Sequence, residues 1–231
     1  MSITENYARL RKEIPDDVTI VLSGKTRTVE QIEEAIDAGV TDIGENYVQE
    51  AGEIYVSLRK KAREVRWHMI GHLQTNKINK ALRIFDIIQT VNSLEKAVAI
   101  DKRVERAKKK IVPVYIEINI GSEFSKAGIK PAEHEPFDEY MEKLAEDISA
   151  LNHLRLEGLM TMGPRFGNLE DVRPYFRRTK KIFERIKALD LPNVDMKHLS
   201  MGMTNSYRIA IEEGSNMIRI GTAIFGERKY R

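Results

Sequence analysis

A lysine follows the first short apolar segment of the chain. Lys25 stands in Ser23-Gly24-Lys25-Thr26, directly after the β-branched run at 18–22. At the inner mouth of a folded protein, loss of water disfavours the charged ammonium and makes the free amine accessible. A free amine attacks an aldehyde and forms a Schiff base. The same position also suits a lysine that points to solvent, so Lys25 is a candidate nucleophile with a plain structural alternative.

Two glycine-containing segments near the C-terminus are candidates for phosphate binding. Ser200-Met201-Gly202 follows the apolar run at 194–199, and Gly221-Thr222 follows the run at 217–220. Glycine lets backbone N–H groups approach a phosphate closely, and Ser and Thr add hydroxyl donors. The alternative is that both glycines serve tight turns alone.

Short apolar runs alternate with amphipathic stretches along the chain, and these elements must position the candidate residues. We expect the runs to be buried strands, because they are short and rich in Ile, Val and Leu. They lie at 18–22, 41–44, 66–70, 87–91, 111–118, 154–160, 194–199 and 217–220. Thr28 and Ser93 are expected helix caps. Helices are expected at 2–13, 28–38, 48–63, 77–83, 93–109, 133–150, 169–189 and 205–213, with a short one at the end.

This alternation predicts the fold. Strict alternation of strand and helix implies a parallel sheet, and eight units within 231 residues favour closure. We therefore predict an α/β protein: a single (β/α)8 TIM barrel over residues 1–231 with an extra N-terminal helix. An open doubly wound sheet is the weaker alternative, because no GxGxxG motif follows any run.

A barrel would bring the candidate residues together. Active sites of such barrels lie at the carboxyl ends of the strands, and the loops after strands seven and eight usually bind phosphate. Polar residues and glycines gather at those ends, at Lys25, Asn46, Gly71-His72, Asn92, Asn119, Thr161, Ser200-Met201-Gly202 and Gly221-Thr222. A lysine on strand one that faces a phosphate site suggests pyridoxal 5′-phosphate (PLP) as the ligand.

Arg219 lies two residues before Gly221 and therefore shares its side of the strand. If it points inward, it is a buried cation that needs an acceptor, and the pyridine nitrogen of PLP could be that acceptor. A guanidinium is a very weak acid and would leave this nitrogen unprotonated. The alternative is a salt bridge to Glu45 or Glu117.

Composition excludes several classes of protein. The absence of cysteine rules out disulfides, thiol catalysis and thiolate metal sites. Thirty-eight basic and 35 acidic residues give a net charge of +3. This small excess does not indicate a broad basic surface for nucleic-acid binding. No apolar run has the ~18–20 residues of a membrane span. The five histidines lack metal-ligand spacing, so we expect no metal site. The charged segment 1–15 is no secretory signal, and we expect a cytoplasmic protein.

A set of motifs covers nearly the whole chain: GENYVQE at 44–50, HMIGHLQTNK at 68–77, EIN at 117–119, SKAG at 125–128, LEGLM at 156–160, HLSMGM at 198–203 and RIGTAIFG at 219–226. With these motifs the sequence resembles the pyridoxal-phosphate homeostasis protein family, which has the barrel fold of the alanine racemase N-terminal domain. The resemblance implies a protein of intracellular PLP (vitamin B6) homeostasis without established catalytic turnover.

The resemblance also implies roles for particular residues. The family lysine that holds PLP as a Schiff base falls on Lys25, although Arg27-Thr28 follows here where the family has a proline. After Ser-Met-Gly-Met the family commonly has Ser and then Asp, whereas this chain has Thr204-Asn205-Ser206. The implied cofactor-binding residues are Lys25, Asn46, Ser200, Met201, Arg219, Gly221 and Thr222.

Two other functions stay open at this stage. A PLP-dependent amino-acid racemase of low activity would use the same site, and a PLP-free phosphate-handling barrel enzyme would use Lys25 as an electrophile or base. Alanine racemases have a second domain that covers the site and supplies a tyrosine base. We expect the barrel to use up this chain, so that water reaches the outer face of the cofactor and racemisation is weak. We also expect a monomer, with apo forms of PLP-dependent enzymes as possible recipients.

Overall fold

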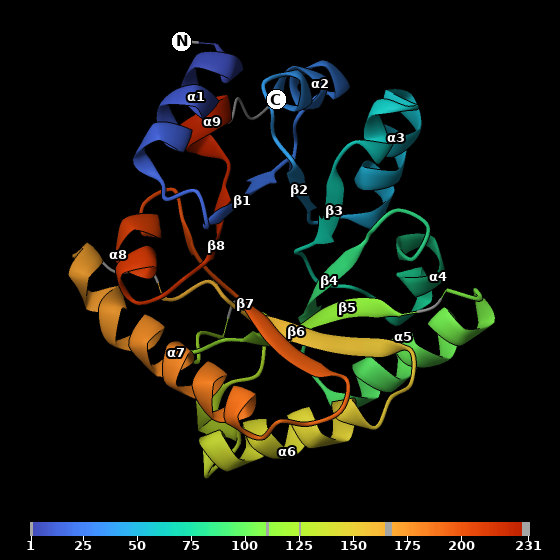
Figure 1. The fold of residues 1–231 in the computed structure, drawn as a ribbon, viewed down its shortest axis with the longest axis vertical. Coiled ribbons are helices and arrows are strands. Elements are labelled where there is room, and N and C mark those ends of the chain that lie inside the picture. The colour runs from blue at the N-terminus through green and yellow to red at the C-terminus, as the bar shows by residue number, and fades with distance from the viewer. Residues whose placement is uncertain (1, 110, 125, 165–167, 228–231) are drawn as a thin grey trace.

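Eight parallel strands, hydrogen-bonded in chain order and closed by pairing of β1 with β8, form a barrel (Figure 1). The computed structural model describes residues 2–109, 111–124, 126–164 and 168–227. The predicted (β/α)8 fold is therefore confirmed. The strands are β1 Thr19–Ser23, β2 Asp42–Glu45, β3 Arg66–Met69, β4 Ile87–Val91, β5 Val112–Ile118, β6 Leu154–Thr161, β7 Val194–Met203 and β8 Met217–Ile220.

Helices surround the barrel on the outside (Figure 1). They are α1 Ile3–Glu13, α2 Val29–Asp37, α3 Val48–Leu58, α4 Ile78–Ala81, α5 Leu94–Arg106, α6 Phe137–Ser149, α7 Arg173–Ala188, α8 Tyr207–Glu212 and α9 Thr222–Phe225. The predicted N-terminal helix is α1, which packs against α9 near the C-terminus. In the described residues no helix has the length and apolar character to cross a membrane.

Alternation along the strands separates two apolar layers. Leu22 and Ile43 point outward and belong to the main buried cluster, which also contains helix residues such as Ile32. A smaller cluster fills the barrel interior with Val21, Ile87, Tyr115, Met160 and Met217. Polar side chains take the remaining interior positions.

Local signals explain several helix boundaries. Thr28 begins α2 with a capping box, in which its hydroxyl accepts from the amide of Gln31 and the Gln31 side chain accepts from the Thr28 amide. Ser93 caps α5 through the amide of Lys96, as predicted. The predicted helix at 133–150 begins later, at Phe137, because Pro136 precedes its first turn.

The end of strand seven was predicted wrongly. The predicted strand ends at residue 199 and leaves Ser200-Met201-Gly202 in the following loop, whereas β7 continues to Met203. Ser200 and Met201 are fully buried and pair with Met160 and Thr161 of β6. A serine and a glycine resembled a turn, but both lie in the sheet, and the loop begins at Thr204.

Candidate functional site

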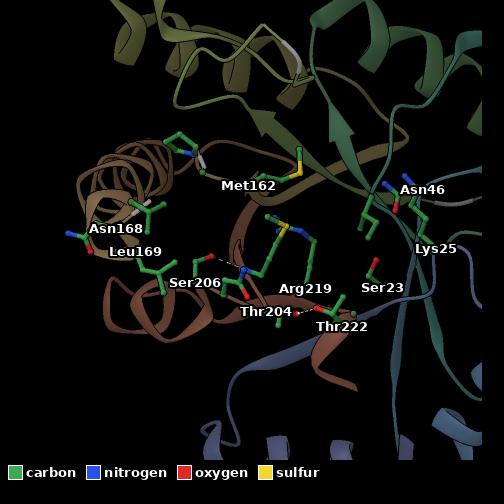
Figure 2. A pocket seen from close by; sticks show the side chains of 17 residues that line it. Ser23, Lys25, Asn46, Met162, Asn168, Leu169, Thr204, Ser206, Arg219 and Thr222 are labelled. Carbon is green, nitrogen blue, oxygen red and sulfur yellow. Dashed lines mark hydrogen bonds between the residues drawn. The ribbon is translucent and has the colours of Figure 1, made fainter. Parts of the chain in front are cut away.

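A pocket of about 590 Å³ opens where β1, β2, β6, β7 and β8 end. This volume is in the range of pockets that bind small ligands. Five of the predicted site residues line it: Lys25, Asn46, Arg219, Gly221 and Thr222. Figure 2 shows Lys25 and Asn46 on one side, Thr204 and Ser206 on the other, and Arg219 between them. Ser200 and Met201 are not part of its lining.

A tight turn after β1 presents Lys25 to the pocket. The Arg27 amide donates to the Gly24 carbonyl at 2.9 Å, so Lys25 is the second residue of a four-residue turn. The third, Thr26, has a φ of 65°, which is unusual for a β-branched residue. Such strain is found where the surroundings hold a functional segment in place. The Nζ atom of Lys25 lies 5.2 Å from the centre of the Tyr47 ring.

A buried carboxyl lies behind this turn. A Cβ on Gly24 would come within 2.2 Å of Glu45 Oε1, so glycine is needed next to the lysine. Glu45 is fully buried, and the Asn46 amide makes only a poorly aligned contact with its carboxyl group. Burial, and then the charge of Glu50, raise the pKa of Glu45 to about 8. Glu45 is therefore mostly protonated at neutral pH.

Asn46 is held by close backbone contact with the next loop. A Cβ on Gly71 would lie 2.3 Å from the Asn46 carbonyl oxygen and 2.6 Å from its Cα. Neither atom belongs to a flexible side chain, so an added methyl group must push the backbone aside. Gly71 thus lets the segment after β3 pack against the pocket wall.

Gly71→Ala is expected to destabilise the protein by about 1–3 kcal/mol, because it overpacks rigid backbone. Urea unfolding of the two proteins measures this difference. Gly52→Ala on α3 is the matched control, since its Cβ would meet side chains only at 3.4 Å and alanine favours a helix. Equal stability of the two variants would contradict the close contact at Gly71.

Hydroxyl groups line the pocket beside and below Arg219 in Figure 2, with Ser206 to its left and Thr204 and Thr222 below it. Thr222 Oγ1 donates to Thr204 Oγ1 at 3.1 Å. Ser206 Oγ accepts from the Met203 amide at 3.2 Å. Thr204 and Ser206 are not among the predicted site residues, because the predicted strand seven ends before the true end of β7. The two residues come directly after the true end of β7. They could be predicted as site residues only if that strand end were known.

Arg219 is a buried cation at the floor of the pocket. Its Nη1 donates to Ser200 O and Oγ at 2.9 and 2.7 Å, and its Nη2 donates to Thr161 O at 2.7 Å. Burial lowers the pKa of Arg219 to about 10, against the opposing charge of Glu117, so the group stays charged at neutral pH. Burial likewise raises the pKa of Glu117 to about 7, and Arg219 opposes this rise.

The alternative role for Arg219 is not observed. Over the described ranges, Arg219 has no salt bridge to Glu45 or Glu117. Glu45 Oε1 lies against Gly24, and Glu117 keeps one oxygen without a hydrogen bond in the described residues. The described part of the chain also holds no group of three His, Asp or Glu residues suited to a metal ion.

Comparison with known proteins places the chain in a family. The family described as "Alanine racemase, N-terminal domain" matches residues 1–229. The pyridoxal phosphate homeostasis protein of Aquifex aeolicus is 40% identical over 212 residues, which are 90% of this chain and 87% of that protein. PipY of Synechococcus elongatus PCC7942, solved with PLP bound, superposes with a TM-score of 0.86 at 28% identity over 97% of this chain and 100% of PipY.

The alanine racemase of Clostridium difficile shares the fold with a TM-score of 0.75 at 16% identity. The match covers 99% of this chain but 56% of the racemase. The family match and the close relatives agree with the motifs in the sequence. The chain belongs to the alanine racemase N-terminal domain family, in the group of pyridoxal phosphate homeostasis proteins.

Proposed function

We propose that the protein binds PLP in this pocket, with Lys25 Nζ as its covalent anchor, and takes part in intracellular PLP (vitamin B6) homeostasis. One observation carries the proposal: a single pocket combines an amine, a buried guanidinium and a group of hydroxyls. The relatives named as pyridoxal phosphate homeostasis proteins and the PLP bound to PipY support it.

The groups in the pocket fit the chemistry of PLP. Bound PLP supplies an aldehyde, and the Lys25 amine forms a C=N bond with its carbon as water leaves. The hydroxyls of Thr204, Ser206 and Thr222 are suitable donors to a phosphate. Ser200 and Met201, which the sequence predicts as cofactor-binding residues, lie outside this lining, and we assign their place to the loop residues Thr204 and Ser206.

Arg219 is suited to bind the pyridine nitrogen of the ligand. A guanidinium only donates hydrogen bonds, and it would leave a pyridine nitrogen unprotonated. An unprotonated ring withdraws electrons less strongly than one paired with a carboxylate. Tyr47 and Leu169, at the rim, are about half exposed. A weak electron sink in an open pocket favours reversible storage of PLP.

Absorbance titration tests the proposal. Increasing PLP is expected to give the protein a visible absorption band that saturates at one equivalent, and pyridoxal, which lacks the phosphate, is expected to bind more weakly. A protein that gives no band with PLP would contradict the proposed function. Equal affinity for the two compounds would contradict the phosphate site.

Thr204→Val with Thr222→Val is expected to weaken PLP binding selectively. Each lost hydrogen bond to a charged phosphate corresponds to about a tenfold rise in Kd. The Kd for pyridoxal should stay unchanged, because it has no phosphate to lose. Ser57→Ala on α3, outside the pocket, is the control. Parallel losses for PLP and pyridoxal would show that the threonines do not act on the phosphate.

The proposal extends to how the protein works in the cell. Residues 1–231 would act as one PLP-binding domain, as a cytoplasmic monomer that passes PLP to apo forms of PLP-dependent enzymes. The half-exposed rim supports access of such a recipient to the ligand. Size-exclusion chromatography tests the monomer. Transfer is tested by adding an apoenzyme to the loaded protein, and activation no faster than spontaneous PLP release would count against direct transfer.

A further inference from the structure

A row of buried hydrogen bonds leaves the pocket at Arg219 and runs through the barrel interior. Ser200 Oγ accepts from Arg219 Nη1 at 2.7 Å and donates to Gln89 Oε1 at 2.8 Å. Gln89 Nε2 lies 2.8 Å from His68 Nδ1, and His68 Nε2 lies 2.8 Å from Asp42 Oδ1. Each of these side chains is 5% exposed or less. The row joins five strands, from β8 to β2.

The chemistry of the groups gives the row a single direction. A carboxamide nitrogen only donates, so in this arrangement His68 Nδ1 accepts from Gln89 and His68 Nε2 donates to Asp42. The Gln89 oxygen only accepts, so the Ser200 proton points to it and the lone pairs of Ser200 remain for Arg219. Every donor therefore points away from the pocket. Hydrogen bonds aligned in this way polarise and strengthen one another.

A fixed negative charge ends the row. Asp42 also accepts from Thr41 Oγ1 at 2.7 Å and from Arg66 Nη2 at 3.0 Å. Although burial alone would raise the pKa of Asp42, the hydrogen bonds from His68, Thr41 and Arg66 bring it below its usual value. Asp42 therefore stays ionised and accepts the last hydrogen bond of the row, from His68.

We propose that Gln89 and His68 are positioning residues that hold the guanidinium of Arg219 at the pocket floor for the bound ligand. This inference rests on the proposed PLP binding. Gln89 does not contact Arg219 and acts through Ser200 Oγ. A carboxamide is a poor relay for protons, so the row orients Arg219 and does not conduct protons to it. The carbonyl groups of Ser200 and Thr161 accept further hydrogen bonds from the same guanidinium.

A double-mutant cycle between Gln89→Met and Arg219→Met tests the proposal. Methionine matches the length of glutamine, is shorter than arginine, and removes the hydrogen bonds of both side chains. Gln89→Met is expected to raise the Kd for PLP about tenfold, because a displaced Arg219 loses about one charge-assisted hydrogen bond to the ligand. In the Arg219→Met background it should have no further effect, because its effect passes through the guanidinium. Additive losses, or PLP binding as tight as in the wild type, would overturn the proposal.

A spectroscopic readout separates positioning from a general loss of stability. The ¹⁵N NMR signal of ring-labelled PLP is expected to move in Gln89→Met and to stay in place in Tyr115→Phe. Tyr115 is the matched control, since its hydroxyl is buried in the same interior and has no hydrogen-bond partner in the described residues. An unmoved signal in Gln89→Met, or the same change in both variants, would overturn the proposal.

Unfolding of the PLP-free variants keeps the two proposals distinguishable. If the wild-type protein binds no PLP, the proposed function fails, while the cycle measured in urea unfolding still reports whether Gln89 and Arg219 are coupled. Coupling supports the hydrogen-bonded row, and additivity rejects it. If Gln89→Met does not fold, Ser200→Ala breaks the same row one link closer to Arg219 and replaces it in every comparison.

Discussion

Lys25→Ala is expected to abolish the visible absorption band of the PLP-loaded protein. Lys25 carries the only amine among the described residues that line the pocket, so no neighbour can replace it as the nucleophile. The hydroxyls and Arg219 remain, so the variant should still bind PLP, more weakly and without a covalent bond. Absorbance spectra and equilibrium dialysis of the two proteins measure both effects.

Two further variants show whether the amine or the charge of Lys25 matters. Lys25→Arg keeps a positive charge but has no nucleophilic amine, and it should lose the band as alanine does. Lys80→Ala, at an exposed position on α4, should keep the band unchanged. A band that persists in Lys25→Ala would show that another amine holds PLP and that the pocket is assigned wrongly.

Glu45→Gln is expected to stabilise the protein at neutral and alkaline pH. The pKa of Glu45 rises from an ordinary value of 4.5 to about 8 on folding, so the native state binds the proton more tightly than the unfolded chain. Stability is therefore greatest below pH 4.5 for this group and falls as the pH rises to about 8. By linkage the loss is on the order of 3 kcal/mol at pH 7. A glutamine amide at the same place removes this loss of stability, because it has no proton to release.

Urea unfolding at pH 5, 7 and 9 measures this effect. The wild type should lose stability across the series, and Glu45→Gln should lose less. In Glu45→Gln, part of the fall in stability with rising pH should remain, because burial also raises the pKa of Glu117 to about 7. Glu34→Gln, exposed on α2, should behave as the wild type does. A Glu45→Gln protein with the full wild-type slope would refute the account of Glu45.

Much of the architecture can be predicted because its signals are local. Short β-branched runs and capped amphipathic stretches lie next to each other in the sequence, and Thr28 and Ser93 mark helix starts by their own side chains. The closed barrel then brings the strand ends together. That rule alone placed Lys25, Asn46 and the Gly221-Thr222 segment around one pocket.

The remaining features depend on contacts between distant residues. Ser200 resembles a loop residue until Gln89, 111 positions away, satisfies its hydroxyl inside the barrel. The true end of β7 depends on its pairing with β6 and β8, and the site position of Thr204 depends on that end. The orientation of Glu45 depends on the strand register, and no pattern in the sequence shows that its carboxyl lies against Gly24.

Reduction and peptide mapping of the PLP-loaded wild-type protein test the central claim most directly. Borohydride converts an imine into a stable secondary amine, and mass spectrometry of the digested protein locates it. We expect one reduced PLP adduct per chain, on Lys25. An adduct on a different lysine, or full retention of PLP without any adduct, would contradict the assignment of Lys25 as its anchor.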